Sequence, residues 1–256
     1  MIQDNPLHYS IGTRVRNGHL IDLLDPGPDD RVLDVGCGTG YFADLFSNKG
    51  AEVWGVDADP YSVNVARIML KDRVKVSGAE SLPSEDNFFD KVLCSEVLEH
   101  IYDDNSAIRE ICRVVKPGGS VVIAVPSYEG VFGAKIKSIC HEHECGLESH
   151  ARDGYSRTEL VTLLEKNGLK VETSLYTMVF FVEMIMGLLK LGYSWKSSSK
   201  HLHSQADLIH VKDSWWVKAF ALILPMLLLV GKMEDVLLAP LLKGHMLIVK
   251  CTATDG

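Results

Sequence analysis

The chain has 256 residues, of which 46% are hydrophobic and 23% are charged, and its formal net charge at pH 7 is −8. This composition excludes a disordered or collagen-like protein, because it supplies enough apolar side chains for an ordinary globular core. The balance of 34 acids against 26 bases also disfavours a nucleic-acid partner, which would need a basic surface to hold its phosphates. The first ten residues are polar and lack a signal-peptide pattern, so we expect a cytoplasmic protein with reduced cysteines.

The first half of the chain alternates short apolar runs with helical patterns. An amphipathic helix is predicted over residues 13–25, where a Pro-Gly-Pro turn ends it. The predicted strands are 31–35, 51–56, 74–77, 89–95 and 120–125, and the predicted helices between them are 41–47, 59–70 and 103–115. Strands that alternate with helices in this way imply parallel strands joined by right-handed crossovers. The predicted fold class is therefore a doubly wound α/β sheet.

The C-terminal third adds two strands and a long insertion between them. Ser156 and Glu159 form a capping-box pattern that starts a helix, and Asn167-Gly168 ends it. Strands are predicted at 169–176 and 245–251, which gives a mostly parallel seven-stranded sheet with an antiparallel terminal strand. We therefore divide the chain into a Rossmann-like domain, residues 1–176 with 244–256, and an apolar helical insertion, residues 177–243.

A glycine-rich loop, Asp34-Val-Gly-Cys-Gly-Thr-Gly40, follows the first strand and precedes the first helix of the alternating pattern. Ligands of open α/β sheets bind beyond the carboxyl ends of the strands, where glycines let the backbone approach them closely. The dinucleotide fingerprint would need glycine where Tyr41 stands, and the phosphate-binding loop would need lysine directly after Gly40. Pyrophosphate binding is therefore disfavoured.

Two acids accompany this loop. Asp34 ends the first strand, where it would repel a phosphate but would suit an ammonium or sulfonium group. Asp57 ends the second strand, a position from which acids of nucleotide-binding sheets accept the ribose hydroxyls. Together they indicate a nucleoside with a cationic tail.

Five motifs in order then resemble those of the class I S-adenosylmethionine-dependent methyltransferases, particularly the quinone-biosynthesis group. The resemblance is strong over residues 30–126 and looser to residue 176. The matching segments are Val32–Gly40, Val56–Ala58, Ala79–Pro83, Phe89–Val92 with Glu96–His100, and Val115–Gly119. The resemblance implies a Rossmann-like fold, S-adenosyl-L-methionine as cofactor, and a small-molecule acceptor.

The same resemblance implies a set of cofactor-binding residues: Asp34, Gly36, Cys37, Gly38, Gly40, Asp57, Ala58, Ala79, Glu80 and Ser95. Family members often carry an acid for the adenine amino group at the position of Gly78, so we assign the adenine contacts to the backbone of Ala79 and to Glu80. Cys37 is interpreted as a small filler of the loop, because nothing near it in sequence would stabilise a thiolate.

A base would help if the acceptor is a hydroxyl or a phenol, and two histidines are candidates. His100 follows the fourth strand, although its Glu-His setting could simply begin a helix. His150 precedes the capped helix, in a segment that many family members fold over the acceptor, although it could be a surface histidine.

The segment Cys140-His-Glu-His-Glu-Cys145 invites a metal interpretation. Its spacing matches none of the usual zinc patterns, and no second ligand pair follows. We expect no metal and interpret the segment as part of a polar lid.

The insertion contains two apolar segments, 176–193, which begins one residue before it, and 215–231. The uncharged stretch 219–231 spans about 20 Å as a helix, short of the roughly 30 Å hydrocarbon core, and Pro225 is expected to interrupt it. A membrane span is therefore disfavoured. Trp215 and Trp216 are typical of an interfacial anchor. Two interpretations remain open: a helical cap or homodimer interface, and a lid that admits a lipid-like acceptor or rests on a membrane surface.

The sequence thus predicts a methyltransferase that moves a methyl group from S-adenosylmethionine to a small or lipid-like acceptor by in-line displacement. The alternatives are a nicotinamide-dependent oxidoreductase and a non-catalytic nucleoside-binding scaffold.

Overall fold

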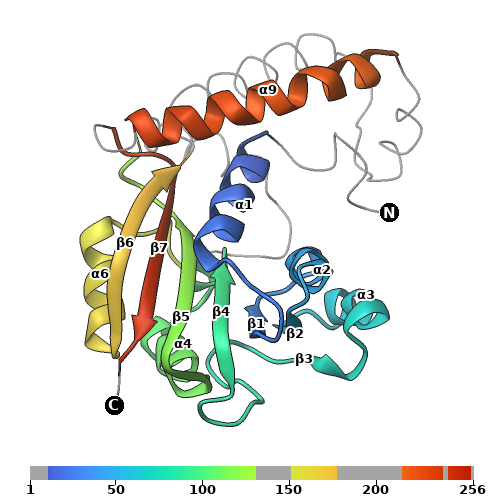
Figure 1. The fold of residues 1–256 in the computed structure, drawn as a ribbon. Helices are drawn as coiled ribbons and strands as arrows, with labels where there is room; N and C mark the ends of the chain where they lie inside the picture. The colour runs from blue at the N-terminus through green and yellow to red at the C-terminus, as the bar shows by residue number, and fades with distance from the viewer. Residues whose placement is uncertain (1–10, 131–150, 178–214, 239–241, 255–256) are drawn as a thin grey trace.

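The computed structural model describes residues 11–130, 151–177, 215–238 and 242–254, and these parts contain one sheet with helices on both faces (Figure 1). The elements in chain order are α1 (Ile11–Leu24), β1 (Arg31–Val35), α2 (Tyr41–Asn48), β2 (Glu52–Asp57), α3 (Pro60–Leu70), the 3₁₀ helix η1 (Lys71–Arg73), β3 (Val74–Val76), β4 (Phe89–Ser95), the 3₁₀ helix η2 (Leu98–His100), α4 (Asp104–Val114), β5 (Val115–Pro126), α6 (Arg157–Lys166), β6 (Leu169–Thr177), α9 (Trp215–Leu238) and β7 (Met246–Ala253).

The sheet of the described residues has seven strands in the order β3-β2-β1-β4-β5-β7-β6. The first five pair in parallel, and β7 pairs antiparallel with both β5 and β6. The predicted fold class is confirmed. Because β7 lies between β5 and β6, the edge at this end of the sheet is β6. The carboxyl ends of β1, β2 and β4 meet at one edge, where the predicted cofactor residues follow the strands.

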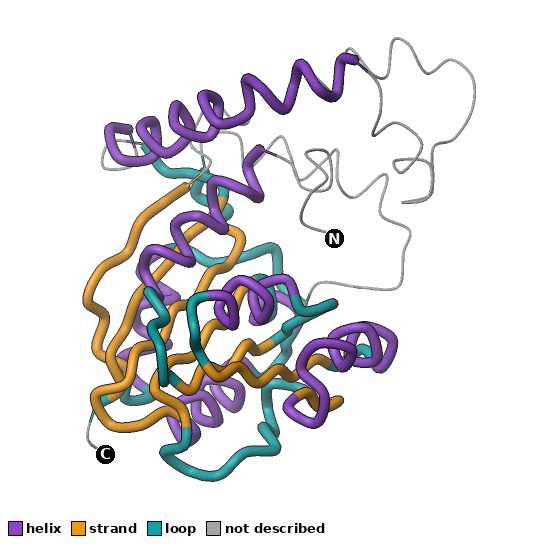
Figure 2. The backbone as a smooth tube through the Cα atoms, turned by 45° about the vertical axis from the view of Figure 1, so that its right-hand side comes forward, coloured by secondary structure: helices purple, strands orange, loops and turns teal. Residues whose placement is uncertain are grey.

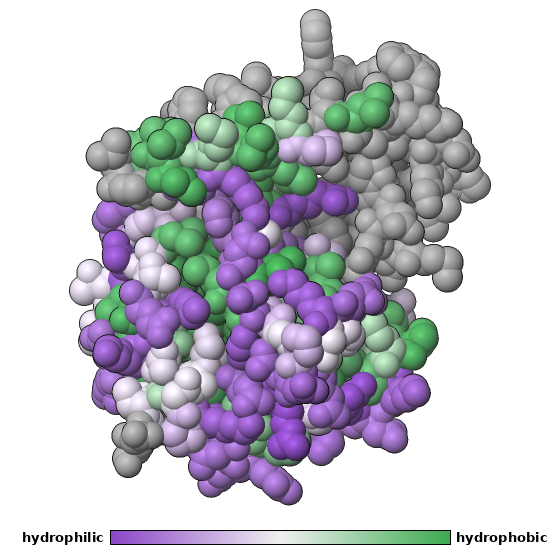
Figure 3. Space-filling model, in the orientation of Figure 1, coloured by the Kyte–Doolittle hydropathy of each residue, from purple (hydrophilic) through white to green (hydrophobic). Residues whose placement is uncertain are grey.

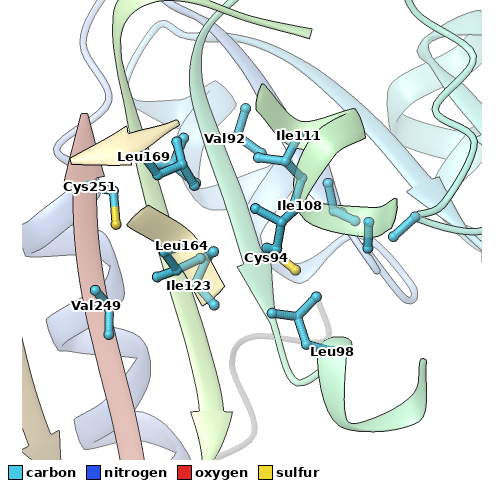
Figure 4. Close-up of a cluster of buried hydrophobic side chains, with 14 of the residues drawn as sticks. Val92, Cys94, Leu98, Ile108, Ile111, Ile123, Leu164, Leu169, Val249 and Cys251 are labelled. Carbon is cyan, nitrogen blue, oxygen red and sulfur yellow. The ribbon is translucent and has the colours of Figure 1, made fainter. Parts of the chain in front are cut away.

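Alternating side chains of the strands build one core on each face of the sheet. On one face, Ile108 and Ile111 of α4 pack with Leu164 of α6 against Val92 and Ile123 of the central strands (Figure 4). The opposite face is covered by α1, α2 and α3, whose buried side chains include Leu20, Phe46 and Ala66 respectively. A strand with both faces covered must be apolar at consecutive positions, which explains why β1 and β4 read as short apolar runs.

Two helix starts follow from the local sequence as predicted. The carboxylate of Asp59 accepts hydrogen bonds from the backbone N–H groups of Tyr61 (3.1 Å) and Ser62 (3.0 Å), and Pro60 occupies the first position of α3. The capping box of Ser156 and Glu159 is present at the start of α6.

The helix predicted over 13–25 is found as α1, but two of its polar residues are not on a solvent face. Arg16 and Asn17 are 7% and 2% exposed. The reason is visible in Figures 1 and 2, where α1 lies between the sheet and α9 and is covered on two sides.

The prediction that Pro225 interrupts the apolar helix was wrong. α9 runs unbroken from Trp215 to Leu238 with Pro225 inside it. Proline removes one backbone hydrogen bond and crowds the preceding turn, and the packing of the following turns against α1 holds the helix together. No helix in the described parts of the chain is long and apolar enough to cross a membrane.

Several sequence predictions concern residues outside the described ranges. They are the segment Cys140–Cys145, His150, and most of the first apolar segment, residues 178–193. The division of the chain into a domain and an insertion stays a prediction. Of the cysteines in the described ranges, Cys37, Cys94, Cys112 and Cys251 are free thiols.

Candidate active site

The glycine loop is fastened to the end of β2 by its backbone. The N–H groups of Gly36 and Cys37 both donate to the carbonyl of Val56, at 2.8 and 3.0 Å. Gly36 has a φ of 73°, and a Cβ built on it would lie 2.2 Å from Cγ2 of Val97. Gly38 has a φ of 52° and nothing within 4 Å of its Cβ position. Gly36 is therefore required by packing, whereas Gly38 leaves an open backbone surface that a ligand can approach.

Asp57 holds the same loop from the second strand. Its Oδ2 accepts a hydrogen bond from the N–H of Gly38 at 2.7 Å, and its Oδ1 accepts one from the N–H of Asp59 at 2.9 Å. Each carboxylate oxygen can accept a second hydrogen bond. The predicted contact with ribose hydroxyls is therefore compatible with this arrangement and stays a prediction.

Asp34 is an acid buried at the end of β1. The residue is 2% exposed, and its Oδ2 has no hydrogen-bond partner. Burial, and next the negative charge of Asp57, raise the pKa of Asp34 to about 8. A buried carboxylate without a partner is costly, and a cation placed beside it would remove that cost. The site is therefore electrostatically prepared for a positively charged ligand.

Cys37 is buried under the loop. A Cβ built on Gly55 would lie 2.8 Å from its Sγ, so the thiol fills the space that the glycine of β2 leaves. Burial, followed by the charges of Asp34 and Asp57, raises the pKa of this thiol above its usual range. The thiol stays protonated, in line with a filler and not a nucleophile.

The residues predicted to contact adenine follow β3. Ala79 is buried, and Glu80 is exposed. A Cβ built on Gly78 would lie 2.8 Å from Oε2 of Glu80. The carboxylate of Glu80 therefore occupies the space in which a side chain at position 78 would begin. The assignment of the adenine contacts to Ala79 and Glu80 stays a prediction.

The turn after β4 adds charged groups that the sequence analysis did not single out. Glu96 has a φ of 57° and forms an ion pair with Arg16 of α1. Glu99 is 2% exposed, and its Oε2 has no hydrogen-bond partner. Burial is the main cause that raises the pKa of Glu99 to about 8. The motif around these acids was matched to the family, but nothing in it indicated that α1 would bring Arg16 to them.

His100 and Ser95 flank the same turn. His100 ends η2, a single 3₁₀ turn, and its backbone N–H donates to the carbonyl of Val97 at 3.0 Å. Ser95 ends β4, and its buried Oγ has no hydrogen-bond partner. Both residues lie at the carboxyl edge of the sheet, the edge at which the glycine loop lies.

The turn is also tied to the segment that begins α6. The carbonyl of Glu99 accepts hydrogen bonds from the N–H groups of Ala151 (2.9 Å) and Arg152 (3.1 Å). Arg152 pairs with Asp104 at 2.9 Å, and the hydroxyl of Tyr155 donates to the same carboxylate at 3.0 Å. This network fixes the chain directly after residue 150.

Comparisons with known proteins bear on this arrangement. Residues 33–123 match the family model described as a methyltransferase domain. The chain is 31% identical over 195 residues to an uncharacterized methyltransferase of Mycobacterium sp. (strain JLS), an alignment that covers 73% of this chain and 69% of that protein. The chain belongs to the class I S-adenosylmethionine-dependent methyltransferases.

Further similar proteins are matched over a smaller share of their own length. An uncharacterized methyltransferase of Mycobacterium leprae (strain Br4923) is 30% identical over 190 residues, and this chain spans 64% of its length. The ubiquinone biosynthesis O-methyltransferase of Alkalilimnicola ehrlichii is 41% identical over 100 residues, covering 37% of this chain and 40% of that protein. Among solved structures, Haemonchus contortus phosphoethanolamine N-methyltransferase 2 in complex with S-adenosyl-L-methionine has a TM-score of 0.63 at 20% identity, covering 98% of this chain and 55% of that one. At this identity the likeness concerns the fold.

The methyltransferase site fits S-adenosylmethionine on its own geometry. Asp34 would offer its buried carboxylate, in which Oδ2 has no hydrogen-bond partner, to the cationic end of the cofactor. Gly38 leaves open backbone that the cofactor could approach, and Asp57, which holds the loop, would still have acceptor positions for ribose hydroxyls. The bound cofactor supplies an activated methyl group on a positively charged sulfur.

Proposed function

We propose that the protein transfers a methyl group from S-adenosylmethionine to a small, lipid-like acceptor. The observation that carries the proposal is the buried carboxylate of Asp34, which lacks a hydrogen-bond partner beside a glycine loop open at Gly38. A cationic nucleoside satisfies both features. A neutral or anionic ligand would leave the carboxylate unmatched.

Two observations support the choice of acceptor. The relative from Alkalilimnicola ehrlichii is named for ubiquinone biosynthesis, and it is 41% identical to this chain over 100 residues. The long helix α9 exposes several large apolar side chains on the carboxyl side of the sheet. An apolar acceptor would partition toward such a surface.

The chemistry asked of the protein is mainly alignment. Methyl transfer from a sulfonium is an in-line displacement, so the protein needs to orient the acceptor and exclude water. For a hydroxyl acceptor, a base near neutral pH would assist, and we propose His100 or His150 for this role. Glu99 is a further candidate, since a carboxyl group with a pKa of about 8 can exchange a proton near neutral pH.

Titration calorimetry with S-adenosylhomocysteine tests the cofactor half of the proposal. We expect binding by the full chain, a strong loss in Asp57→Ala, and no binding of a nicotinamide dinucleotide. Tight binding of the dinucleotide in place of S-adenosylhomocysteine would overturn the proposal in favour of an oxidoreductase.

Incubation with S-adenosylmethionine labelled in the methyl group and a total lipid extract tests the acceptor half. We expect label in an organic-soluble product, and reduced turnover in His100→Ala or His150→Ala with cofactor binding retained. Cofactor binding without transfer to lipid extract or to aqueous metabolites would favour a non-catalytic scaffold. Label confined to water-soluble products would overturn the lipid-like acceptor alone.

A further inference from the structure

In the part of helix α9 whose side chains the structure describes, the charged residues contact the rest of the protein and the exposed residues are apolar. Lys232 pairs with Asp22 of α1 at 2.7 Å. Asp235 is 3% exposed, lies 3.0 Å from Nε2 of His19, and accepts a hydrogen bond from the hydroxyl of Thr177. The helix is thus held to α1 and β6 by ionic and polar contacts.

The fit between α9 and α1 is close on this polar side. A Cβ built on Gly18 would lie 2.6 Å from Cε of Lys232, so the aliphatic stem of the lysine lies across the glycine. Glu234 and Gly231 are also buried. The polar side of α9 is therefore a packed interface within the chain, and the opposite side is left for another contact.

The opposite side is apolar throughout the part of α9 whose side chains the structure describes. At 3.6 residues per turn, its exposed positions fall within an arc of about 140°. These positions are Leu222, Pro225, Met226, Leu229, Val230, Met233, Val236 and Leu237. Figure 3 shows apolar side chains gathered along this helix. None of the charged residues named above lies in the arc.

The width of the arc argues for a continuous apolar medium. A seam between two paired helices needs only a narrow stripe with a repeat of 3.5 residues. An arc of about 140° along a helix exceeds that stripe and matches a helix that lies in the boundary between headgroups and acyl chains. Eight isolated apolar residues would be ordinary on a surface, but a continuous patch without charge marks an interaction site.

The charges at the end of the arc indicate which surface covers it. A cavity of about 580 Å³ lies at this end of the arc, and Val236 and Leu242 form part of its wall. The polar part of the wall carries both positive and negative charges. The wall includes the exposed guanidinium of Arg157 and an ion pair between Lys243 and Glu129. Groups of both signs complement a headgroup that carries a phosphate and an ammonium. The net charge of −8 argues against attraction to an anionic surface.

The geometry points to α9 as the element by which this protein lies on a bilayer of zwitterionic phospholipid, with the apolar arc in the interface and the cavity at headgroup level. α9 lies across the carboxyl side of the sheet (Figure 1). Docking by this helix therefore orients the glycine loop and the turn after β4 on the membrane-proximal side of the molecule. The inference extends the proposed function, but vesicle binding does not require methyl transfer, so the two can fail separately.

Sedimentation of the full chain with phosphatidylcholine vesicles tests the inference. We expect cosedimentation that is insensitive to salt and is not increased by anionic lipid. Leu229→Asp and Met233→Asp should each lower the vesicle partition coefficient by about tenfold or more, because each removes an apolar side chain that the bilayer would cover and places a charge in the membrane interface. S-adenosylhomocysteine binding, measured in parallel, should be unchanged in both variants.

The matched control is Ile68→Asp on α3, since Ile68 is 84% exposed and Leu229 is 60% exposed, and both are aliphatic. This variant should bind vesicles like the unaltered chain. Equal partition of all the variants, absence of cosedimentation, or strict dependence on anionic lipid would overturn the inference. A lipid-free dimer that Leu229→Asp dissociates, together with no vesicle binding, would overturn it in favour of a second copy of the chain.

Discussion

The edge of the sheet that carries the glycine loop and the junction of α1 with α9 each bury an acid. The two acids differ in whether the chain supplies hydrogen-bond partners for them. Asp34 is 2% exposed and one of its carboxylate oxygens has no hydrogen-bond partner. Asp235 is 3% exposed and its carboxylate meets His19 and Thr177. A buried acid whose partners belong to the chain stabilises the fold, whereas one that lacks them stores a cost that a ligand can relieve.

The largest expected effect is the loss of cofactor binding when the unmatched acid is neutralised. Asp34→Asn keeps the volume of the side chain but cannot ionise beside the bound ammonium group, so we expect S-adenosylhomocysteine to bind about a hundredfold or more weakly. Calorimetric titration measures the change. Asp22→Asn, which removes an acid of the α1–α9 junction, is the control and should bind as before. Equal affinities of Asp34→Asn and Asp22→Asn for S-adenosylhomocysteine would contradict the idea that only the acid without partners serves the ligand.

Replacing Asp235, the acid with partners in the chain, should lower stability and leave cofactor affinity almost unchanged. Asp235→Ala leaves His19 and Thr177 without their shared acceptor, and we expect a loss of about 3 kcal/mol in the free energy of unfolding. Chemical denaturation measures the loss. Cofactor affinity of the folded fraction should change little, since the acid lies among α1, β6 and α9. A large loss of affinity at unchanged stability would mean that this acid serves the ligand instead.

A steric prediction sharpens the account of the glycine loop. Gly36→Ala brings a methyl group within 2.2 Å of Val97 at a φ of 73°, so it should destabilise the protein by about 2 kcal/mol or more through contact and strain together. Gly118→Ala is the control, with a similar φ of 75° and nothing within 4 Å. It should cost about 1 kcal/mol from strain alone. Adding Val97→Ala to Gly36→Ala should recover part of the difference, and no recovery would count against the steric explanation.

The strands, the helix caps and the glycine loop could be predicted because each depends on neighbours in sequence. Asp59 with Pro60, and Ser156 with Glu159, specify helix starts within a few residues, and the structure has both. Asp34 and Asp57 could be placed at one edge because parallel strands bring their carboxyl ends together. Such features can be predicted because the residues that interact lie close together in the sequence.

The parts that could not be predicted depend on distant partners. Arg16 meets Glu96 across 80 positions of the chain, and nothing near either residue indicates the pairing. The uninterrupted course of α9 past Pro225 likewise depends on α1, whose Asp22 and His19 hold the turns that follow. The sequence shows the local cost of proline inside a helix, but it does not show the distant packing that offsets this cost.

A pH dependence of the free energy of unfolding should separate the two kinds of acid. The pKa values of Asp34 and Glu99 are raised to about 8 by burial, from ordinary values of 3.8 and 4.5 in the unfolded chain. Between about pH 5 and pH 8 the folded state therefore binds more protons than the unfolded state. The free energy of unfolding should fall as pH rises, by at most about 1.4 kcal/mol per pH unit for each group.

Thermal denaturation of the free protein at several pH values measures this slope, and S-adenosylhomocysteine identifies its source. Its ammonium group beside Asp34 should lower the pKa of that carboxyl and remove its share of the slope, leaving the share of Glu99. Asp34→Asn should reduce the slope in the same way without ligand, whereas Asp22→Asn should leave it unchanged. A slope in Asp34→Asn as steep as that of the unaltered chain would mean that the Asp34 carboxylate is already matched by a group of the chain, and the contrast between the two regions would then fail at its central residue.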